Sequence, residues 1–243
     1  MEIKGKVALV TGANRGLGTA LVRALIEAGC AKVYAAARDV GKLPESSATA
    51  VRLDITDPGQ VAAAAAQCSD VEILLNNAGV AAFEPLIAAP SIDFARTEME
   101  TNYFGTLSMC RAFAPALAHN GGGVIANVLS VVSWFNAPMQ GSYCASKAAA
   151  WSLTRGMRFE LRKQGTLVVG IYAGYVDTDM TAGLDAAKST PAQIAARVLA
   201  GIESGAEEID ADGRAVSVRA ELLRDATAFD ANMQQIWDAR GAR

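Results

Sequence analysis

A tyrosine and a lysine four residues apart are the side chains best suited to chemistry. Tyr143 and Lys147 close the segment from Ser130 to Lys147. On a helix this spacing places both on one face, about 6 Å apart along the axis. An ammonium beside a phenol favours the phenolate, so we expect Lys147 to lower the pKa of Tyr143 from its usual value near ~10. Ser130 can add a hydroxyl, and the three residues together predict a proton-transfer site.

Such a pair also occurs on exposed helices without any function, so the prediction depends on the elements that position it. Short apolar runs rich in valine and alanine alternate with segments of helical spacing. Strands are predicted at Lys6 to Thr11, Val33 to Ala37, Thr49 to Leu53, Glu72 to Leu75, Val124 to Leu129, Thr166 to Ala173 and Glu207 to Asp210. This alternation indicates a doubly wound (Rossmann-type) α/β fold, with a parallel sheet of about seven strands and helices on both faces.

The helices carry their own signals. Asp57 followed by Pro58 begins an alanine-rich helix, because an acidic N-cap and a proline at the first position suit a helix start. A long helix is expected from about Arg96 to Asn120 with a kink at Pro115, and the link between the second and third strands is too short for a full helix. The tail from Asp212 to Arg243 predicts no element. We expect one domain over residues 1–243.

Composition excludes several classes of protein. The net charge of -3 argues against a nucleic-acid partner. Four cysteines without C-x-x-C spacing and a single histidine, His119, give no reason to expect a metal site or a disulfide framework. The sequence contains no run of about 18 apolar residues, so no membrane span is predicted. The first residues lack a signal-peptide core. A cytoplasmic protein is expected.

A glycine turn follows the first strand. Thr11 to Gly18 reads TGANRGLG and opens a helix. Missing side chains let a pyrophosphate approach backbone N–H groups at the positive helix N-terminus. A purely structural glycine turn is the alternative.

Several separated motifs together resemble the short-chain dehydrogenase/reductase family. They are TGANRGLG, the NNAG of Asn76 to Gly79, the METNYFGT that contains Asn102, Ser130, and GSYCASKAA. Two departures are Ala173-Gly174 where the family usually has Pro-Gly, and Leu129-Ser130 where it usually has two serines.

The resemblance implies an NAD(P)-dependent oxidoreductase of carbonyls or secondary alcohols. Tyr143 would transfer the proton, Ser130 would hold the oxygen, Lys147 would hold the nicotinamide ribose, and Asn102 would position a water that links the lysine to solvent. The cofactor residues implied are Gly12, Asn14, Arg15, Gly16, Leu17, Gly18, Arg38, Asp54, Ile55, Asn77, Ala78, Gly79, Tyr143, Lys147, Gly174, Val176 and Thr178.

The end of the second strand bears on the choice of cofactor. An acidic residue there would bind the ribose 2′-hydroxyl of NAD, whereas this chain has Arg38, with Arg15 in the glycine turn. Two guanidinium groups can bracket a 2′-phosphate, which favours NADP(H) over NAD(H). Asp39 weakens this argument, and both arginines could be surface residues. Asp54 is either the adenine contact or a turn residue.

The substrate pocket is expected between Val80 to Pro90, Val131 to Ser142 and Tyr175 to Lys188. No arginine or lysine precedes Lys188 there to pair a carboxylate, so an apolar or aromatic substrate is expected. Cys144 is interpreted as a helix-packing residue. The apolar side chains of these segments are Phe83, Trp134, Phe135, Met139, Tyr175 and Met180.

Two other functions stay open: a regulatory or scaffold protein that binds NADP without turnover, and a sugar-nucleotide epimerase or dehydratase. The intact Ser130, Tyr143 and Lys147 set argues against the first, and the length argues against the second. The resemblance also implies a homodimer or homotetramer, with Phe104, Phe113 and Trp151 facing outward.

Overall fold

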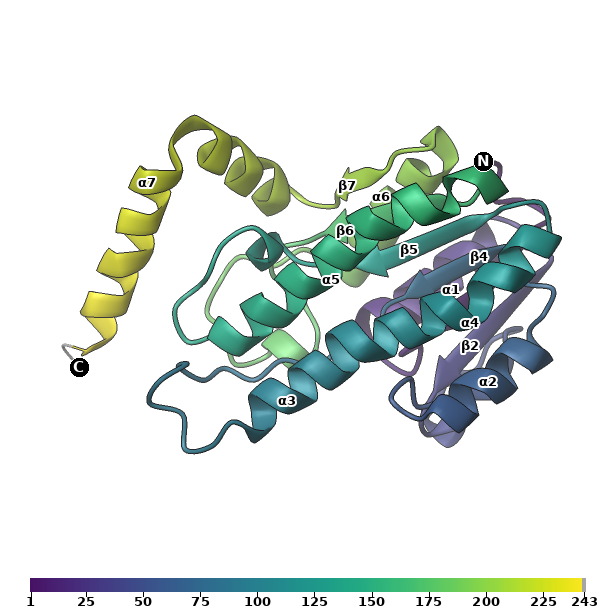
Figure 1. The fold of residues 1–243 in the computed structure, drawn as a ribbon, viewed down its shortest axis with the longest axis horizontal. Coiled ribbons are helices and arrows are strands. Elements are labelled where there is room, and N and C mark those ends of the chain that lie inside the picture. The colour runs from purple at the N-terminus through teal and green to yellow at the C-terminus, as the bar shows by residue number, and fades with distance from the viewer. Residues whose placement is uncertain (242–243) are drawn as a thin grey trace.

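The computed structural model describes residues 1–241 and contains one seven-stranded sheet in which every pairing is parallel (Figure 1). The strand order is β3-β2-β1-β4-β5-β6-β7. The predicted fold class is confirmed, and each predicted strand is present with slightly shifted ends. The strands are β1 Val7–Thr11, β2 Lys32–Ala37, β3 Thr49–Arg52, β4 Ile73–Asn76, β5 Val124–Val128, β6 Leu167–Tyr172 and β7 Glu208–Asp210.

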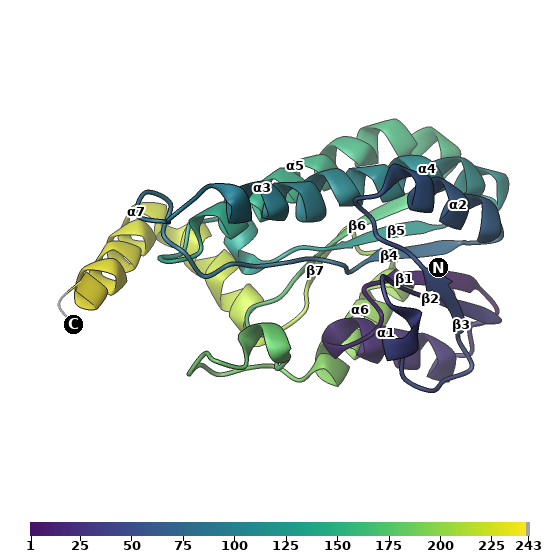
Figure 2. The same ribbon diagram turned by 90° about the horizontal axis from the view of Figure 1, so that it is seen from below.

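Helices cover both faces of the sheet (Figure 2). One layer holds α2 Pro58–Gln67, α3 Asp93–Met99, α4 Thr106–His119 and α5 Gly141–Leu161, and the other holds α1 Gly16–Glu27 and α6 Pro191–Ser204. Neighbouring strand residues alternate between the layers: Leu9 packs into the core of the first, and Ala8 and Val10 into the core of the second. Burial on both faces explains why the strands are almost uninterruptedly apolar.

Two predictions made from local sequence are confirmed: the start of α2 at Asp57 and Pro58, and the absence of a full helix between β2 and β3. Asp57 accepts hydrogen bonds from the backbone N–H groups of Gly59 and Gln60, and Pro58 occupies the first turn of α2. Between β2 and β3 the chain forms only a 3-10 turn, Val40–Lys42.

The helix predicted over Arg96 to Asn120 is interrupted, but not at Pro115. A π-helical segment, Glu100–Gly105, joins α3 to α4, and Pro115 lies within α4. A π turn holds an extra residue. Phe113, predicted to face outward, is fully buried with Cys110 and Leu117 on the same face of α4, whereas Phe104 is exposed.

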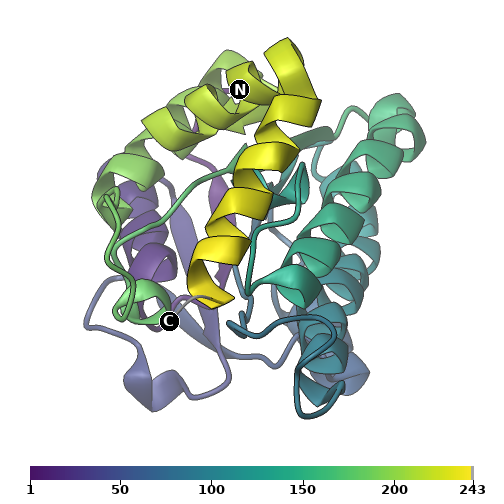
Figure 3. The same cartoon turned by 90° about the vertical axis from the view of Figure 1, so that its left-hand side faces the viewer.

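The C-terminal segment, for which no element was predicted, forms α7, Gly213–Gly241. Asp225 has non-helical dihedral angles (φ -162°, ψ 90°) and divides α7 into two halves. Its Oδ1 atom accepts a hydrogen bond from Ala228 N, which caps the second half, residues 226–241. Figure 3 shows this half crossing in front of the carboxyl ends of the strands. Across residues 1–241, no helix combines the length and the apolar character that crossing a membrane requires.

A glycine substitution tests the close contact between β1 and α1. A Cβ atom on Gly18 would lie 2.1 Å from the carbonyl oxygen of Gly12, so Gly18→Ala should lower the free energy of unfolding by about 1–3 kcal/mol. Gly156→Ala is the control: nothing lies within 4 Å of its Cβ position inside α5, and it should raise stability by about 0.5–1 kcal/mol. Urea denaturation of the cofactor-free protein measures both, and an unchanged Gly18→Ala would contradict the contact.

Candidate active site

The glycine turn after β1 is tied to the end of β4. The Asn77 side chain donates from Nδ2 to the carbonyl oxygens of Thr11 (2.9 Å) and Gly12 (3.2 Å). The Thr11 hydroxyl accepts from the backbone N–H groups of Asn77 and Ala78, both at 3.0 Å. Because the strand order reverses between β1 and β4, a crevice for a ligand opens at this point.

A cavity of about 950 Å³ lies at the carboxyl ends of the strands. Every residue predicted to bind the cofactor lines it, from the glycine turn to Thr178. Ser130, Tyr143 and Lys147 line it too, so the proton-transfer residues and the glycine turn share one cavity. Asn102 is not among its lining residues.

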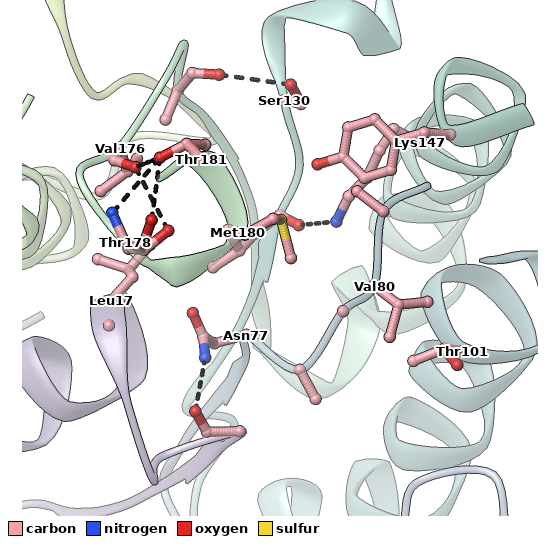
Figure 4. A pocket seen from close by; sticks show the side chains of 18 of the residues that line it. Leu17, Asn77, Val80, Thr101, Ser130, Lys147, Val176, Thr178, Met180 and Thr181 are labelled. Carbon is pink, nitrogen blue, oxygen red and sulfur yellow. Dashed lines mark hydrogen bonds between the residues drawn. The ribbon is translucent and has the colours of Figure 1, made fainter. Parts of the chain in front are cut away.

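Lys147 is a buried cation in this cavity. Only 5% of the residue is exposed, and its Nζ atom donates a 2.9 Å hydrogen bond to the carbonyl oxygen of Val128 (Figure 4). Burial lowers the pKa of Lys147 from 10.5 to about 8. The Nζ atom lies 5.7 Å from the centre of the Tyr143 ring, as the helical spacing predicts.

The predicted lowering of the Tyr143 pKa by Lys147 is not found. Desolvation raises the pKa of Tyr143 above its usual value, and the Ser130 hydroxyl lowers it only in part. Electrostatic interactions with Cys144 and Glu98 also raise it. The prediction of a lowered pKa was wrong for the protein without ligands, because loss of water around the phenolate outweighs a cation that lies over the ring.

Ser130 places its hydroxyl at the end of β5. It precedes the 3-10 turn Val131–Ser133, accepts from Val132 N at 3.4 Å and donates to the carbonyl oxygen of Ala173 at 3.4 Å (Figure 4). Both hydrogen bonds are long, so the hydroxyl can be redirected at small cost.

Asn102 lies in the π-helical segment and is 2% exposed. Its Nδ2 atom donates to Val80 O and Ser146 Oγ, both at 2.9 Å, and its Oδ1 atom accepts from Val80 N at 3.0 Å. A Cβ atom on Gly79 would lie 3.1 Å from Asn102 Oδ1 and 3.6 Å from Lys147 Nζ. The Asn102 side chain thus lies close to Lys147, but its amide is hydrogen-bonded to Val80 and Ser146. That it positions a water stays a prediction.

The opposite end of the cavity holds the two arginines considered for cofactor choice. Arg15 pairs with Asp179 at 3.2 Å, and both side chains are largely exposed. Arg38 forms no ion pair with any residue in the range 1–241. Asp39 accepts a hydrogen bond from Gly41 N, and its carboxylate lies 3.6 Å from Lys42 Nζ. These two neighbours partly neutralise its charge.

Asp54 is a turn residue that also lines the cavity, and its contact with adenine stays a prediction. Its carboxylate accepts hydrogen bonds from Thr56 N (3.0 Å) and Thr56 Oγ1 (2.8 Å), as in a turn, and the residue also lines the cavity. Across residues 1–241, no group of three or more His, Cys, Asp and Glu side chains is arranged for a metal ion.

Four of the six apolar side chains predicted for the substrate pocket line the cavity. Phe83, Phe135, Tyr175 and Met180 line the cavity, but Trp134 and Met139 do not. The Trp134 ring instead packs 4.4 Å from the Tyr172 ring, beneath the guanidinium of Arg219.

Sequence reasoning missed the contribution of α7. Met233, Ile236 and Arg240 line the cavity from its second half, and Arg214 lines it from its first turn. The three segments predicted to form the pocket contain no arginine or lysine before Lys188, but Arg214 and Arg240 reach the cavity from α7, which was not considered. The spacing of Phe229, Met233, Ile236 and Arg240 is helical and was the available signal.

Cys144 is buried beside Tyr143. Its sulfur accepts a hydrogen bond from Ala137 N, and burial raises its thiol pKa. Both properties agree with a packing residue rather than a nucleophile.

Lys147 leads to a prediction about stability. Its folded pKa of about 8 lies below the ordinary 10.5, so between these values the unfolded chain binds more protons and the free energy of unfolding rises with pH. From pH 7 to pH 10 the cofactor-free protein should gain about 2 kcal/mol relative to Lys147→Met. Urea denaturation of both proteins across this range measures it. A difference that does not vary with pH would contradict a buried cation.

Three comparisons bear on the family. A family model described as short chain dehydrogenase matches residues 6–189. The 3-oxoacyl-(acyl-carrier-protein) reductase FabG of Salmonella typhimurium is 30% identical over 218 residues, 86% of this chain and 88% of that protein. Dehydrogenase/reductase SDR family member 7B of Mus musculus is 32% identical over 196 residues, 74% of this chain, and the chain spans 60% of that protein's length.

A solved structure agrees over nearly the whole chain. The crystal structure of a short chain dehydrogenase from Burkholderia cenocepacia J2315 in complex with NADP has a TM-score of 0.93 and 42% sequence identity, and the match covers 96% of this chain and 99% of that chain. This similarity, the family match and the shared cavity of glycine turn, Tyr143 and Lys147 lead to one conclusion: the chain belongs to the short-chain dehydrogenase/reductase family.

Proposed function

We propose that the protein is an NADP(H)-dependent oxidoreductase that interconverts an apolar or aromatic carbonyl compound and its secondary alcohol, with Tyr143 as acid and base. Family membership makes it an NAD(P)-dependent oxidoreductase. The observation that carries the finer proposal is that Ser130, Tyr143 and Lys147 line the same cavity as the glycine turn.

The turn suits a dinucleotide. Gly12 and Gly16 have positive φ values of 64° and 53°, and a Cβ atom on Gly12, Gly16 or Gly18 would meet protein atoms within 3 Å. The turn can keep its shape only without side chains there, which leaves backbone N–H groups open to a pyrophosphate at the start of α1.

The protein's own residues supply the proton chemistry. When bound, the cofactor would donate or accept the hydride. The raised pKa of Tyr143 keeps the phenol protonated at neutral pH, so it can donate its proton to a carbonyl oxygen. Ser130 would hold that oxygen by turning its hydroxyl from Ala173 O. Lys147, held by Val128 O, would stabilise the phenolate formed as the proton leaves.

The preference for NADP(H) rests on Arg38 and Arg15. Arg38 lines the cavity just after β2 and is exposed, and the charge of the adjacent Asp39 is engaged by Lys42. A planar guanidinium there suits a 2′-phosphate. The 42%-identical Burkholderia relative is described as an NADP complex, which supports the proposal.

We further propose that residues 1–243 form a single domain, although residues 242–243 lie outside the part that the structure describes. We also propose a cytoplasmic location and a homodimer or homotetramer. The exposed Phe104 and the half-buried Trp151 support a contact between copies through the helical layer that contains α4 and α5. The apolar lining by Phe83, Phe135 and Met233 supports an apolar substrate.

Replacing the phenol tests the mechanism. Tyr143→Phe should lower kcat for carbonyl reduction about 10²- to 10⁴-fold, because the ring stays and only the acid is lost. NADPH binding should change by less than about threefold, since the phenyl ring still fills its place. Oxidation of NADPH over a panel of aldehydes and ketones measures turnover, and fluorescence titration measures binding. Unchanged turnover in the variant would refute the mechanism, and binding without turnover in the wild type would favour a cofactor sensor.

Replacing Arg38 tests the cofactor. Arg38→Leu should reduce kcat/KM for NADPH about 10- to 100-fold, the loss expected for a charge-assisted hydrogen bond, and leave NADH nearly unchanged. Arg23→Leu is the matched control, because Arg23 is exposed on α1 and does not line the cavity. Equal losses for both cofactors would contradict a 2′-phosphate site at Arg38.

A further inference from the structure

Glu98 is a buried carboxylate that the proposed mechanism does not use. It lies in α3, is 1% exposed, and accepts a 2.6 Å hydrogen bond from Ala82 N through Oε1. Its other oxygen, Oε2, has no hydrogen-bond partner among residues 1–241. Burying a carboxylate with an unsatisfied oxygen is costly, so a site that contains one needs an explanation beyond packing.

The partner of Glu98, Ala82, lies within a segment that forms part of the cavity wall. Val80, Ala81 and Phe83 line the cavity, whereas Ala82 and Glu98 do not. Glu98 thus holds the segment at its one residue between Val80 and Phe83 that does not line the cavity.

Asn102 holds the same wall one turn further along. Its amide accepts from Val80 N and donates to Val80 O, so residues 98 and 102 bind alternate residues of the segment, Ala82 and Val80. Asn102 also donates to Ser146 Oγ, next to Lys147 on α5. The helix and the π-helical segment thus clamp the wall to the helix that carries the proton-transfer residues.

The charge of Glu98 reaches those residues. It raises the pKa values of both Tyr143 and Cys144. The other groups that affect the pKa of Tyr143 are the Ser130 hydroxyl from the end of β5 and Cys144 on its own helix, while Lys147 lies over the ring. Glu98 is thus near enough to Tyr143 to act on it electrostatically.

We propose that Glu98 is a positioning residue, whose carboxylate fixes Ala82 and thereby the cavity wall from Val80 to Phe83 beside Tyr143. The inference about turnover depends on the proposed function. The inference about the wall itself does not, because the bond to Ala82 N exists without substrate.

Two substitutions of similar volume separate the hydrogen bond from the packing. Glu98→Gln keeps an acceptor for Ala82 N, and Glu98→Met removes it. Glu98→Met should lower kcat/KM for carbonyl reduction about 10- to 100-fold, mainly through kcat, because small misplacements at a reacting centre cost about this much. Glu98→Gln should restore it to within about threefold. Glu203→Met, the same change at an exposed position of α6, is the control.

Amide hydrogen exchange of Ala82, followed by NMR, gives a readout without turnover. Exchange should be slow in the wild type and in Glu98→Gln, and at least about tenfold faster in Glu98→Met, because only that variant frees the N–H. Fast exchange of Ala82 in the wild type would overturn the inference even if Glu98→Met does not fold. Equal losses in both variants would also overturn it. If no carbonyl is reduced by the wild type but the exchange pattern holds, the proposed function fails and the anchoring of the wall stands.

Discussion

The reversal of strand order between β1 and β4 is the constraint on which the site depends. Parallel strands all end at the same edge, and at this point the connections leave in opposite directions, so a crevice opens between them. The hydrogen bonds between Thr11 and Asn77 fix the two sides of that gap relative to each other. The glycine turn, the segment after β4 and the helix that carries Tyr143 all border this crevice.

Desolvation then sets the chemistry of the groups placed around the gap. It acts in opposite directions on the two titratable partners: it lowers the pKa of Lys147 and raises the pKa of Tyr143. Both shifts favour the neutral form, so the two pKa values, which are similar in water, move apart, and the phenol holds its proton more firmly than the ammonium does. At neutral pH the phenol is therefore protonated and able to donate, while the nearby ammonium favours the phenolate that forms when the proton leaves.

The sequence predicted what depends on local pattern and failed where distant segments decide. Strand runs such as Ile73–Asn76 and the cap at Asp57 follow from composition and backbone hydrogen bonding, and the helical spacing of Tyr143 and Lys147 survived unchanged. The π-helical segment was not predicted, because residue spacing alone does not mark it, and in the structure its Asn102 binds the distant Val80. Phe113, predicted to face outward, is buried with Cys110 and Leu117.

Other failures share this origin. Arg214 and Arg240 reach the cavity from a helix that is polar when viewed alone, and its function as a wall appears only in three dimensions. The pKa of Tyr143 depends on how much water the folded protein removes, which no spacing rule contains.

The break at Asp225 divides α7 into two halves, and few side chains of the second half are buried. Of residues 226–240, only Phe229 is buried, against Phe135, while the rest lie at the surface or face the cavity. The family match ends at residue 189, well before this point. Apart from Phe229, substitutions after Asp225 should therefore cost little in folding free energy, whereas those at Met233, Ile236 and Arg240 would reshape the mouth of the cavity without disturbing the sheet beneath it.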